Sequence, residues 1–75
     1  MLKEGTNWKA VAVQARGNCD MMIAVCKDIT LSSQAADQIE AAKAACRSLF
    51  TLRHKHSPAR AEVAEIRYER LIGLL

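Results

Sequence analysis

The side chains of this chain that are most often reactive in proteins are Cys19, Cys26, Cys46, His54 and His56. A thiol beside an imidazole is the arrangement of a cysteine nucleophile, and thiolates with imidazoles are the usual ligands of zinc. The spacing supports neither chemistry, because no Cys-x-x-Cys or His-x3-His pair is present. Cys26 and Cys46 also fall on apolar patterns, where cysteine packs as a small hydrophobic residue. The sequence therefore predicts a protein that is not an enzyme and that holds no metal or cofactor.

The cysteines also bear on the compartment. Three cysteines leave one thiol over in any disulfide scheme, and no run of residues resembles a signal peptide or a membrane span. A reducing, cytoplasmic setting without a membrane partner is the simplest expectation.

After the apolar runs of residues 8–28, the best functional signal is a basic stretch. No acidic residue lies between Glu40 and Glu62, and the predicted basic patch in and beside that interval consists of Lys43, Arg47, Arg53, His54, Lys55, His56 and Arg60. Such a patch suits the phosphates of a nucleic acid or the surface of an acidic protein. It equally suits a helix end, where cations complement the helix dipole. Only Phe50 is an aromatic neighbour, so a platform that stacks bases of a single strand is not indicated.

The elements that position these residues fit one domain, residues 1–75, with a flexible lead at 1–7. Residues 8–28 are predicted to form a β-hairpin, because Gly17-Asn18 separates two apolar runs and glycine supplies the positive φ of a tight turn. In that register Arg16 lies opposite Cys19 and both faces of the hairpin are apolar.

A single helix can cover only one face of that hairpin, and the sequence leaves open which face it covers. The other face is predicted to dock a protein partner, because tryptophan and arginine are enriched where interfaces bind most tightly. The predicted partner-binding residues are Trp8, Val11, Val13, Arg16 and Met22.

The covering helix is predicted at residues 33–50, where apolar residues recur at intervals of three and four from Ala35 to Leu49. Thr30 or Ser32 is expected to cap its start. Residues 51–60 are predicted to be a basic connector, since Ser57-Pro58 interrupts the helical pattern.

Residues 61–70 fit two patterns. Ala64, Ile66 and Tyr68 alternate as in a strand, whereas a helix capped by Ser57 with Pro58 in its first turn also places apolar residues on one face. We favour the strand, because a two-stranded hairpin is marginal without a third. The predicted fold is thus an α+β domain of ββαβ topology. Its three-stranded antiparallel sheet has the order 2-1-3, one helix covers one face of the sheet, and residues 71–75 form an apolar tail. The alternative is a hairpin followed by two helices.

The ββαβ pattern, with Glu62-Val63-Ala64-Glu65-Ile66-Arg67 as its third strand, resembles small bacteriophage proteins that regulate the host RNA polymerase. Gly5-Thr6-Asn7-Trp8-Lys9 and Leu52-Arg53-His54-Lys55-His56-Ser57-Pro58 are most similar to phage antiterminators that also shut off host initiation. The resemblance implies a non-enzymatic ligand of bacterial RNA polymerase in the infected cytoplasm, acting near the RNA exit region, with the basic connector meeting nascent RNA or acidic polymerase surface. The pattern is also similar to other phage inhibitors of host functions, including CRISPR inhibitors, and a small basic nucleic-acid-binding module is a further alternative.

Overall fold

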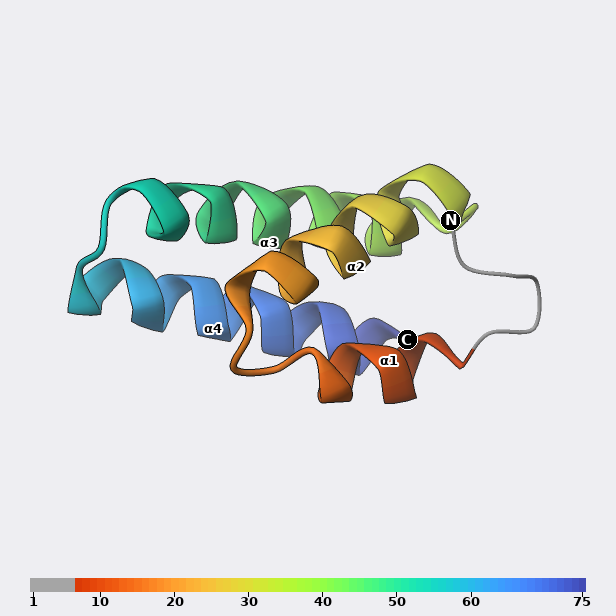
Figure 1. The fold of residues 1–75 in the computed structure, drawn as a ribbon. Coiled ribbons are helices and arrows are strands. Elements are labelled where there is room, and N and C mark those ends of the chain that lie inside the picture. The colour runs from red at the N-terminus through yellow and green to blue at the C-terminus, as the bar shows by residue number, and fades with distance from the viewer. Residues whose placement is uncertain (1–6) are drawn as a thin grey trace.

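Four α-helices make up residues 7–75, the part of the chain that the computed structural model describes (Figure 1). They are α1 (Trp8–Gln14), α2 (Cys19–Ser32), α3 (Ala36–His54) and α4 (Pro58–Leu74). No strand occurs in this range, so the predicted ββαβ sheet is wrong and the domain is all-α. The predicted flexible lead falls mostly on residues 1–6, outside the described residues.

The segment predicted to be a hairpin forms α1 and α2, because its apolar residues follow the helical period. In α1, Trp8, Val11, Ala12 and Ala15 recur at intervals of three, one and three, and all four face the core. In α2 the buried positions are Met22, Ile23, Val25, Cys26 and Ile29, which also form one helical face. A strand would have split each set between two faces.

Two asparagines start these helices. The Asn7 side chain accepts a hydrogen bond from the Ala10 amide at 3.2 Å, and the Asn18 side chain accepts one from the Met21 amide at 3.1 Å. Asparagine is among the best residues at this position, because its side chain satisfies an amide that has no partner within the helix. Gly17 does have the predicted positive φ, 88°, but the turn that it makes joins two helices.

The predicted helix at 33–50 is confirmed as a helix, with its bounds moved to Ala36–His54. Neither Thr30 nor Ser32 caps it, since both lie in α2 and donate to the Cys26 and Asp28 carbonyls one turn back. The chain instead turns at Ser33, whose hydroxyl accepts from the Ala35 amide at 3.3 Å.

The predicted third strand at 61–70 is wrong, because these residues belong to α4. The helical alternative describes its start correctly: the Ser57 hydroxyl accepts from the Arg60 amide at 3.2 Å, and Pro58 is in the first turn. The predicted connector at 51–60 is mostly helical and shrinks to the turn at 55–57, and the predicted tail completes α4, with Leu71 and Ile72 buried.

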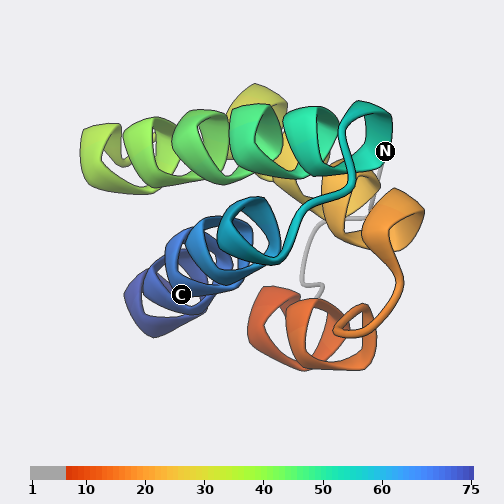
Figure 2. The same cartoon turned by 90° about the vertical axis from the view of Figure 1, so that its left-hand side faces the viewer.

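Helix α3 packs against both α2 and α4, each of which runs antiparallel to it (Figure 1). Viewed from the end, α1 lies to the side of α4 and below α2, where it closes the core (Figure 2). Small side chains such as Ala42 and Ala45 are fully buried along α3, which allows its neighbours to approach closely. The largest fully buried side chain is Tyr68 of α4, whose hydroxyl donates to the Ala12 carbonyl of α1 at 2.8 Å.

Candidate functional site

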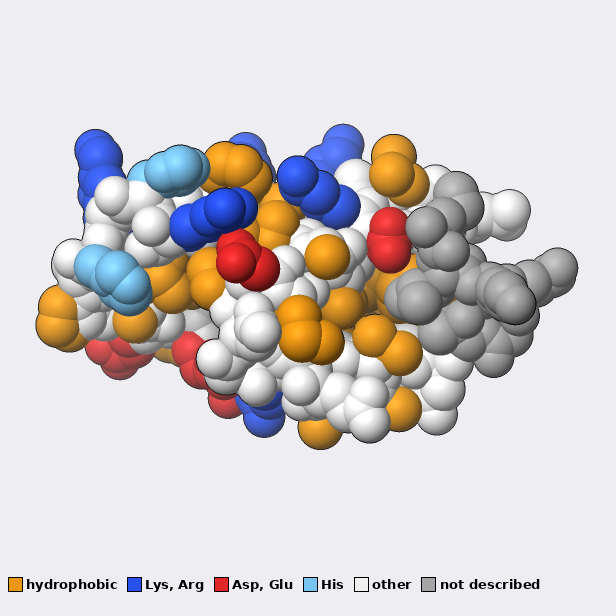
Figure 3. Space-filling view, viewed as in Figure 1, with side chains coloured by type: hydrophobic (Ala, Val, Ile, Leu, Met, Phe, Trp, Pro, Cys, Tyr) orange, Lys and Arg blue, Asp and Glu red, His pale blue; other side chains and the backbone are white. Residues whose placement is uncertain are grey.

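Charged side chains are distributed unevenly over the surface. On the face drawn in Figure 3, lysine, arginine and histidine side chains gather mainly along the upper edge, over α2 and α3, while acidic side chains lie both at the centre of the face and at the lower left, below α4. The surface along α3 is therefore the one suited to a negatively charged ligand.

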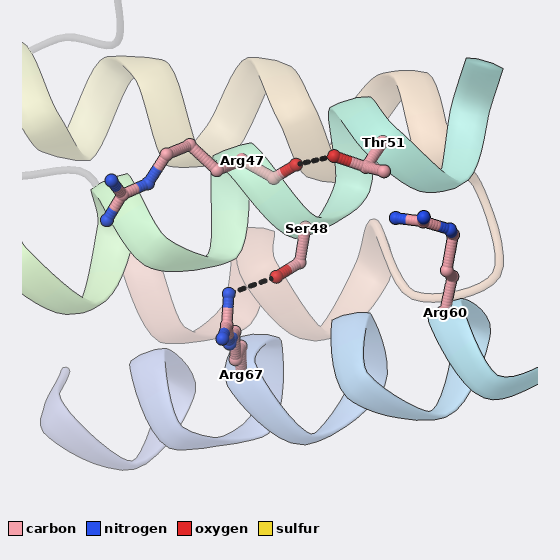
Figure 4. A pocket seen from close by; sticks show the side chains of 5 residues that line it. All are labelled: Arg47, Ser48, Thr51, Arg60 and Arg67. Carbon is pink, nitrogen blue, oxygen red and sulfur yellow. Dashed lines mark hydrogen bonds between the residues drawn. The ribbon is translucent and has the colours of Figure 1, made fainter. Parts of the chain in front are cut away.

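An open cleft of about 440 Å³ lies between α3 and α4. Two hydroxyl side chains and three arginines line it: Ser48, Thr51, Arg47, Arg60 and Arg67 (Figure 4). No carboxylate of the described residues lines this cleft. It is the strongest candidate for a functional site, because cationic side chains from two helices line one opening.

Helical spacing brings these residues to the cleft. Arg47 and Thr51 are one turn apart on α3, and Arg60 and Arg67 are two turns apart on the same face of α4. The Arg60 guanidinium reaches from the first turn of α4 toward α3, whereas that of Arg47 extends in the other direction along α3 (Figure 4).

One arginine of the cleft is held in place by the neighbouring helix. Arg67 donates from its Nη1 to the Ser48 Oγ at 2.7 Å, and Ser48 is itself 8% exposed. The Thr51 hydroxyl donates back to the Arg47 carbonyl at 2.9 Å, so it offers only acceptor capacity to a ligand. The hydrogen-bond donors available in the cleft are therefore chiefly guanidinium groups.

The ion pairs of residues 7–75 do not include the arginines of the cleft. They join Arg16 to Glu65 and Glu69 at 3.3 and 2.7 Å, and Arg53 to Asp20 at 3.3 Å. Within the described chain the charges of Arg47, Arg60 and Arg67 are thus not neutralised by a carboxylate at ion-pair distance. A neighbouring hollow shares Arg47 and Arg67 but also contains acidic residues, Asp37 and Glu40, so the purely basic part ends there.

The structure divides the predicted basic patch. Arg47 and Arg60 line the cleft, while Lys55 and His56 lie in the turn that follows α3. Lys43 points to a different hollow, Arg53 pairs with Asp20, and the His54 ring lies 5.4 Å from that of Phe50. All seven residues of the patch are exposed.

Sequence reasoning missed Arg67, which the strand prediction directed toward solvent. The signal that identifies it is its distance of seven residues from Arg60, because two helical turns place both side chains on one face. It missed Lys27 of α2 as well, which the structure places beside the Phe50 ring at 5.4 Å.

The predicted partner-binding residues do not form one exposed surface. Met22 is buried at 5% exposure, Trp8 and Val11 are half-buried against the core, and Val13 is exposed. Arg16 is engaged by the two glutamates of α4. The sheet with two apolar faces, on which the predicted docking face depended, is replaced by helices that bury Met22 and partly bury Trp8 and Val11.

Cys19 and Cys26 are placed where their thiolate forms are disfavoured. Burial, with a smaller contribution from Cys46, raises the pKa of Cys26 to about 12. Burial and the nearby Asp20 also raise the pKa of Cys19, whose thiol lies 3.4 Å from the Leu49 carbonyl as a donor. Residues 7–75 contain no cluster of three or more histidine, cysteine, aspartate or glutamate side chains that could hold a metal ion.

Neither membrane insertion nor similarity to known proteins indicates a function. None of the helices α1 to α4 is both long enough and apolar enough to cross a lipid bilayer. No protein-family model, curated protein or solved structure shows significant similarity to the chain. A function must therefore be inferred from the geometry of the site.

Proposed function

We propose that this protein is a non-enzymatic binding module that holds the phosphate backbone of a nucleic-acid duplex along α3 and in the cleft between α3 and α4. The observation that carries the proposal is that Arg47, Arg60 and Arg67, from two helices, line one opening that no described carboxylate lines. A guanidinium presents paired donors that match phosphate oxygens, and its charge persists at every physiological pH.

The length over which cations recur favours a polymer over a single phosphate. Cations recur from Lys43 of α3 to Lys55 in the turn after it, over about 18 Å at 1.5 Å per residue; of these, Lys43 lines the hollow on the α2 side and Arg53 is paired with Asp20. At ~3.4 Å of axis per phosphate, this length matches roughly five phosphates of one strand. The anchored position of Arg67 also lowers the entropy lost when it binds.

A duplex backbone fits this surface better than an unpaired strand. Phe50 is the one aromatic residue on the basic side of α3, and Lys27 and His54 already lie against its ring. Recognition of unpaired bases depends on exposed aromatic faces, whereas recognition of a duplex backbone depends on spaced cations. Binding is accordingly expected to depend on salt and little on base sequence.

Fluorescence anisotropy with a labelled 20-base-pair DNA or RNA duplex, titrated between 50 and 200 mM NaCl, tests this function. We expect Arg60→Ala and Arg67→Ala each to weaken binding and to reduce the slope of log affinity against log salt by about one. Lys9→Ala is the matched control, because it removes the same charge from α1, which contributes nothing to the cleft. A slope that stays unchanged in both arginine variants, or a control that loses as much as they do, refutes the proposal.

Binding to bacterial RNA polymerase, with inhibition of host initiation and promotion of antitermination, is a separate proposal. Its support is the similarity of residues 5–9 and 52–58 to phage antiterminators, since the ββαβ pattern no longer contributes. Both proposals place the protein in the cytoplasm. The test is whether tagged protein retains the large polymerase subunits from a bacterial lysate. Failure to retain them would refute the polymerase proposal and would leave the nucleic-acid proposal unaffected.

A further inference from the structure

A third hollow, of about 500 Å³, lies between α2 and α3. It differs in character from the cleft lined by Arg47, Arg60 and Arg67, which we refer to as the arginine cleft. The lining of the third hollow consists of Lys27, Thr30, Leu31, Lys43, Cys46 and Arg47. We refer to it as the α2–α3 groove. Its lining combines apolar side chains with three cations and includes no carboxylate of the described residues. The groove is thus both hydrophobic and positively charged.

Exposed large hydrophobic side chains lie on both helices, in or next to this groove. Leu31, near the end of α2, is 75% exposed, and Phe50 of α3 is 40% exposed. The Lys27 ammonium lies 5.4 Å from the Phe50 ring, which shows that this part of α2 faces Phe50 across the two helices. Hydrophobic and basic side chains are interspersed along the upper edge of Figure 3, over α2 and α3.

We propose that the α2–α3 groove docks an acidic amphipathic helix of a partner protein. Amphipathic helices bind in hydrophobic grooves through apolar residues at positions i, i+3 or i+4, and i+7. The lining runs from Lys43 to Arg47 on α3 and from Lys27 to Leu31 on α2, in each case about 6 Å at 1.5 Å per residue or one helical turn, which matches the i to i+4 part of that spacing. The Phe50 ring, beside Lys27, offers a further apolar contact next to the groove.

Charge complementarity selects an acidic helix. Lys27, Lys43 and Arg47 stand on both walls of the groove, where carboxylates flanking the apolar face of a partner helix would meet them. A second copy of this chain is a poor occupant, because a symmetric pairing through the groove would bring the same three cations against each other. The apolar lining, in turn, distinguishes this groove from the polar cleft that we assign to phosphates.

This proposal does not depend on the proposed nucleic-acid binding, although Arg47 lines both sites.

The probe is a fluorescein-labelled synthetic peptide of about four helical turns, with leucines at i, i+3 and i+7 and glutamates at most other positions. A scrambled peptide of identical composition, which has no apolar face, is the reference. We expect the amphipathic peptide to bind at least ten-fold more tightly than the scrambled one.

Leu31→Glu is the decisive variant, because it places a carboxylate in the groove at a position that contributes little to the core. It is expected to weaken peptide binding at least ten-fold. Ile66→Glu on α4, where the side chain is 58% exposed, is the matched control and should leave binding unchanged. Amide shifts of ¹⁵N-labelled wild-type protein on adding peptide should concentrate around Leu31, Cys46 and Phe50, which tests the site even if a variant fails to fold.

Several results would overturn the inference. They are equal binding of the two peptides, equal losses in Leu31→Glu and Ile66→Glu, or amide shifts centred away from the groove. Sedimentation of the protein alone that shows self-association abolished by Leu31→Glu would identify a second copy as the occupant. Binding to phosphatidylglycerol vesicles that is lost in the same variant, without peptide binding, would identify a lipid surface.

Discussion

The hydroxyl of Tyr68 completes the carboxyl end of α1, so Tyr68→Phe should destabilise the fold measurably. The amides of Ala15 and Arg16 bond the carbonyls of Val11 and Val13, which leaves the Ala12 carbonyl to the Tyr68 hydroxyl at 2.8 Å. Carbonyls in the last turn of a helix lack partners within the helix and need one from elsewhere. Ala12 and Tyr68 are both fully buried, so water cannot replace this bond without rearrangement.

The expected cost follows from that burial. Phenylalanine keeps the ring in the core, and the chief loss is the donor to a buried carbonyl, which costs about 2 kcal/mol. A domain of this size loses 4–8 °C per kcal/mol, so the unfolding midpoint should fall by roughly 8 to 16 °C. Because the lost bond joins α1 to α4, the amides of α1 should also exchange with solvent faster than those of α3.

Urea unfolding followed by circular dichroism measures the free energy of unfolding, and native-state hydrogen exchange locates the loss. Arg16→Ala is the comparison, since it also removes a link between α1 and α4 but breaks exposed ion pairs, which contribute about 0–1 kcal/mol. If Tyr68→Phe stays within about 0.5 kcal/mol of the wild type, the hydroxyl is not the partner that this carbonyl requires.

Three other substitutions or conditions test different parts of the fold. Burial raises the pKa of Cys26 to about 12 from an ordinary 9.0, so the thiol ionises at lower pH in the unfolded protein than in the folded one. The free energy of unfolding should therefore fall as pH rises from about 9 toward 12. Urea unfolding midpoints measured across this pH range test the fall, and Cys26→Ala should make it less steep. Gly17→Ala forces a side chain into positive φ with no atom within 4 Å of the new Cβ, so it should cost only the conformational penalty of about 1–2 kcal/mol by the same measurement. Ser48→Ala frees Arg67, and duplex affinity should fall roughly two- to ten-fold as the guanidinium loses its fixed position.

Each of these expectations can fail in a distinct way. A stability that stays constant up to pH 12 would show that the Cys26 thiol is not protected from ionisation. A Gly17→Ala variant as stable as the wild type would show that the turn adapts to negative φ. Duplex affinity unchanged in Ser48→Ala would show that Arg67 binds phosphate without its anchor, or does not bind it.

Local signals in the sequence identified some elements and misidentified others. The spacing from Ala35 to Leu49 identified α3, and Ser57-Pro58 marked the start of α4 under the helical alternative. Residues 8–28 were misread because short runs of alanine, valine and methionine fit both a period of two and a period of 3.6. Helix α1, at seven residues, is too short to be stable alone and depends on its packing against α4 and α2.

The sequence by itself determined that cations accumulate between Lys43 and Arg60. Only the helix found at 58–74 places Arg60 and Arg67 on one face. The sequence did not determine which charges meet. Helix pairing in the tertiary structure brings Arg67 against Ser48, 19 residues away, buries Met22, and occupies Arg53 with Asp20. Spacing along a helix decides which side chains share a face, whereas burial of apolar surface decides which faces come together. The arginine cleft and the α2–α3 groove each lie between two helices, so they exist only because burial of apolar surface packs those helices together.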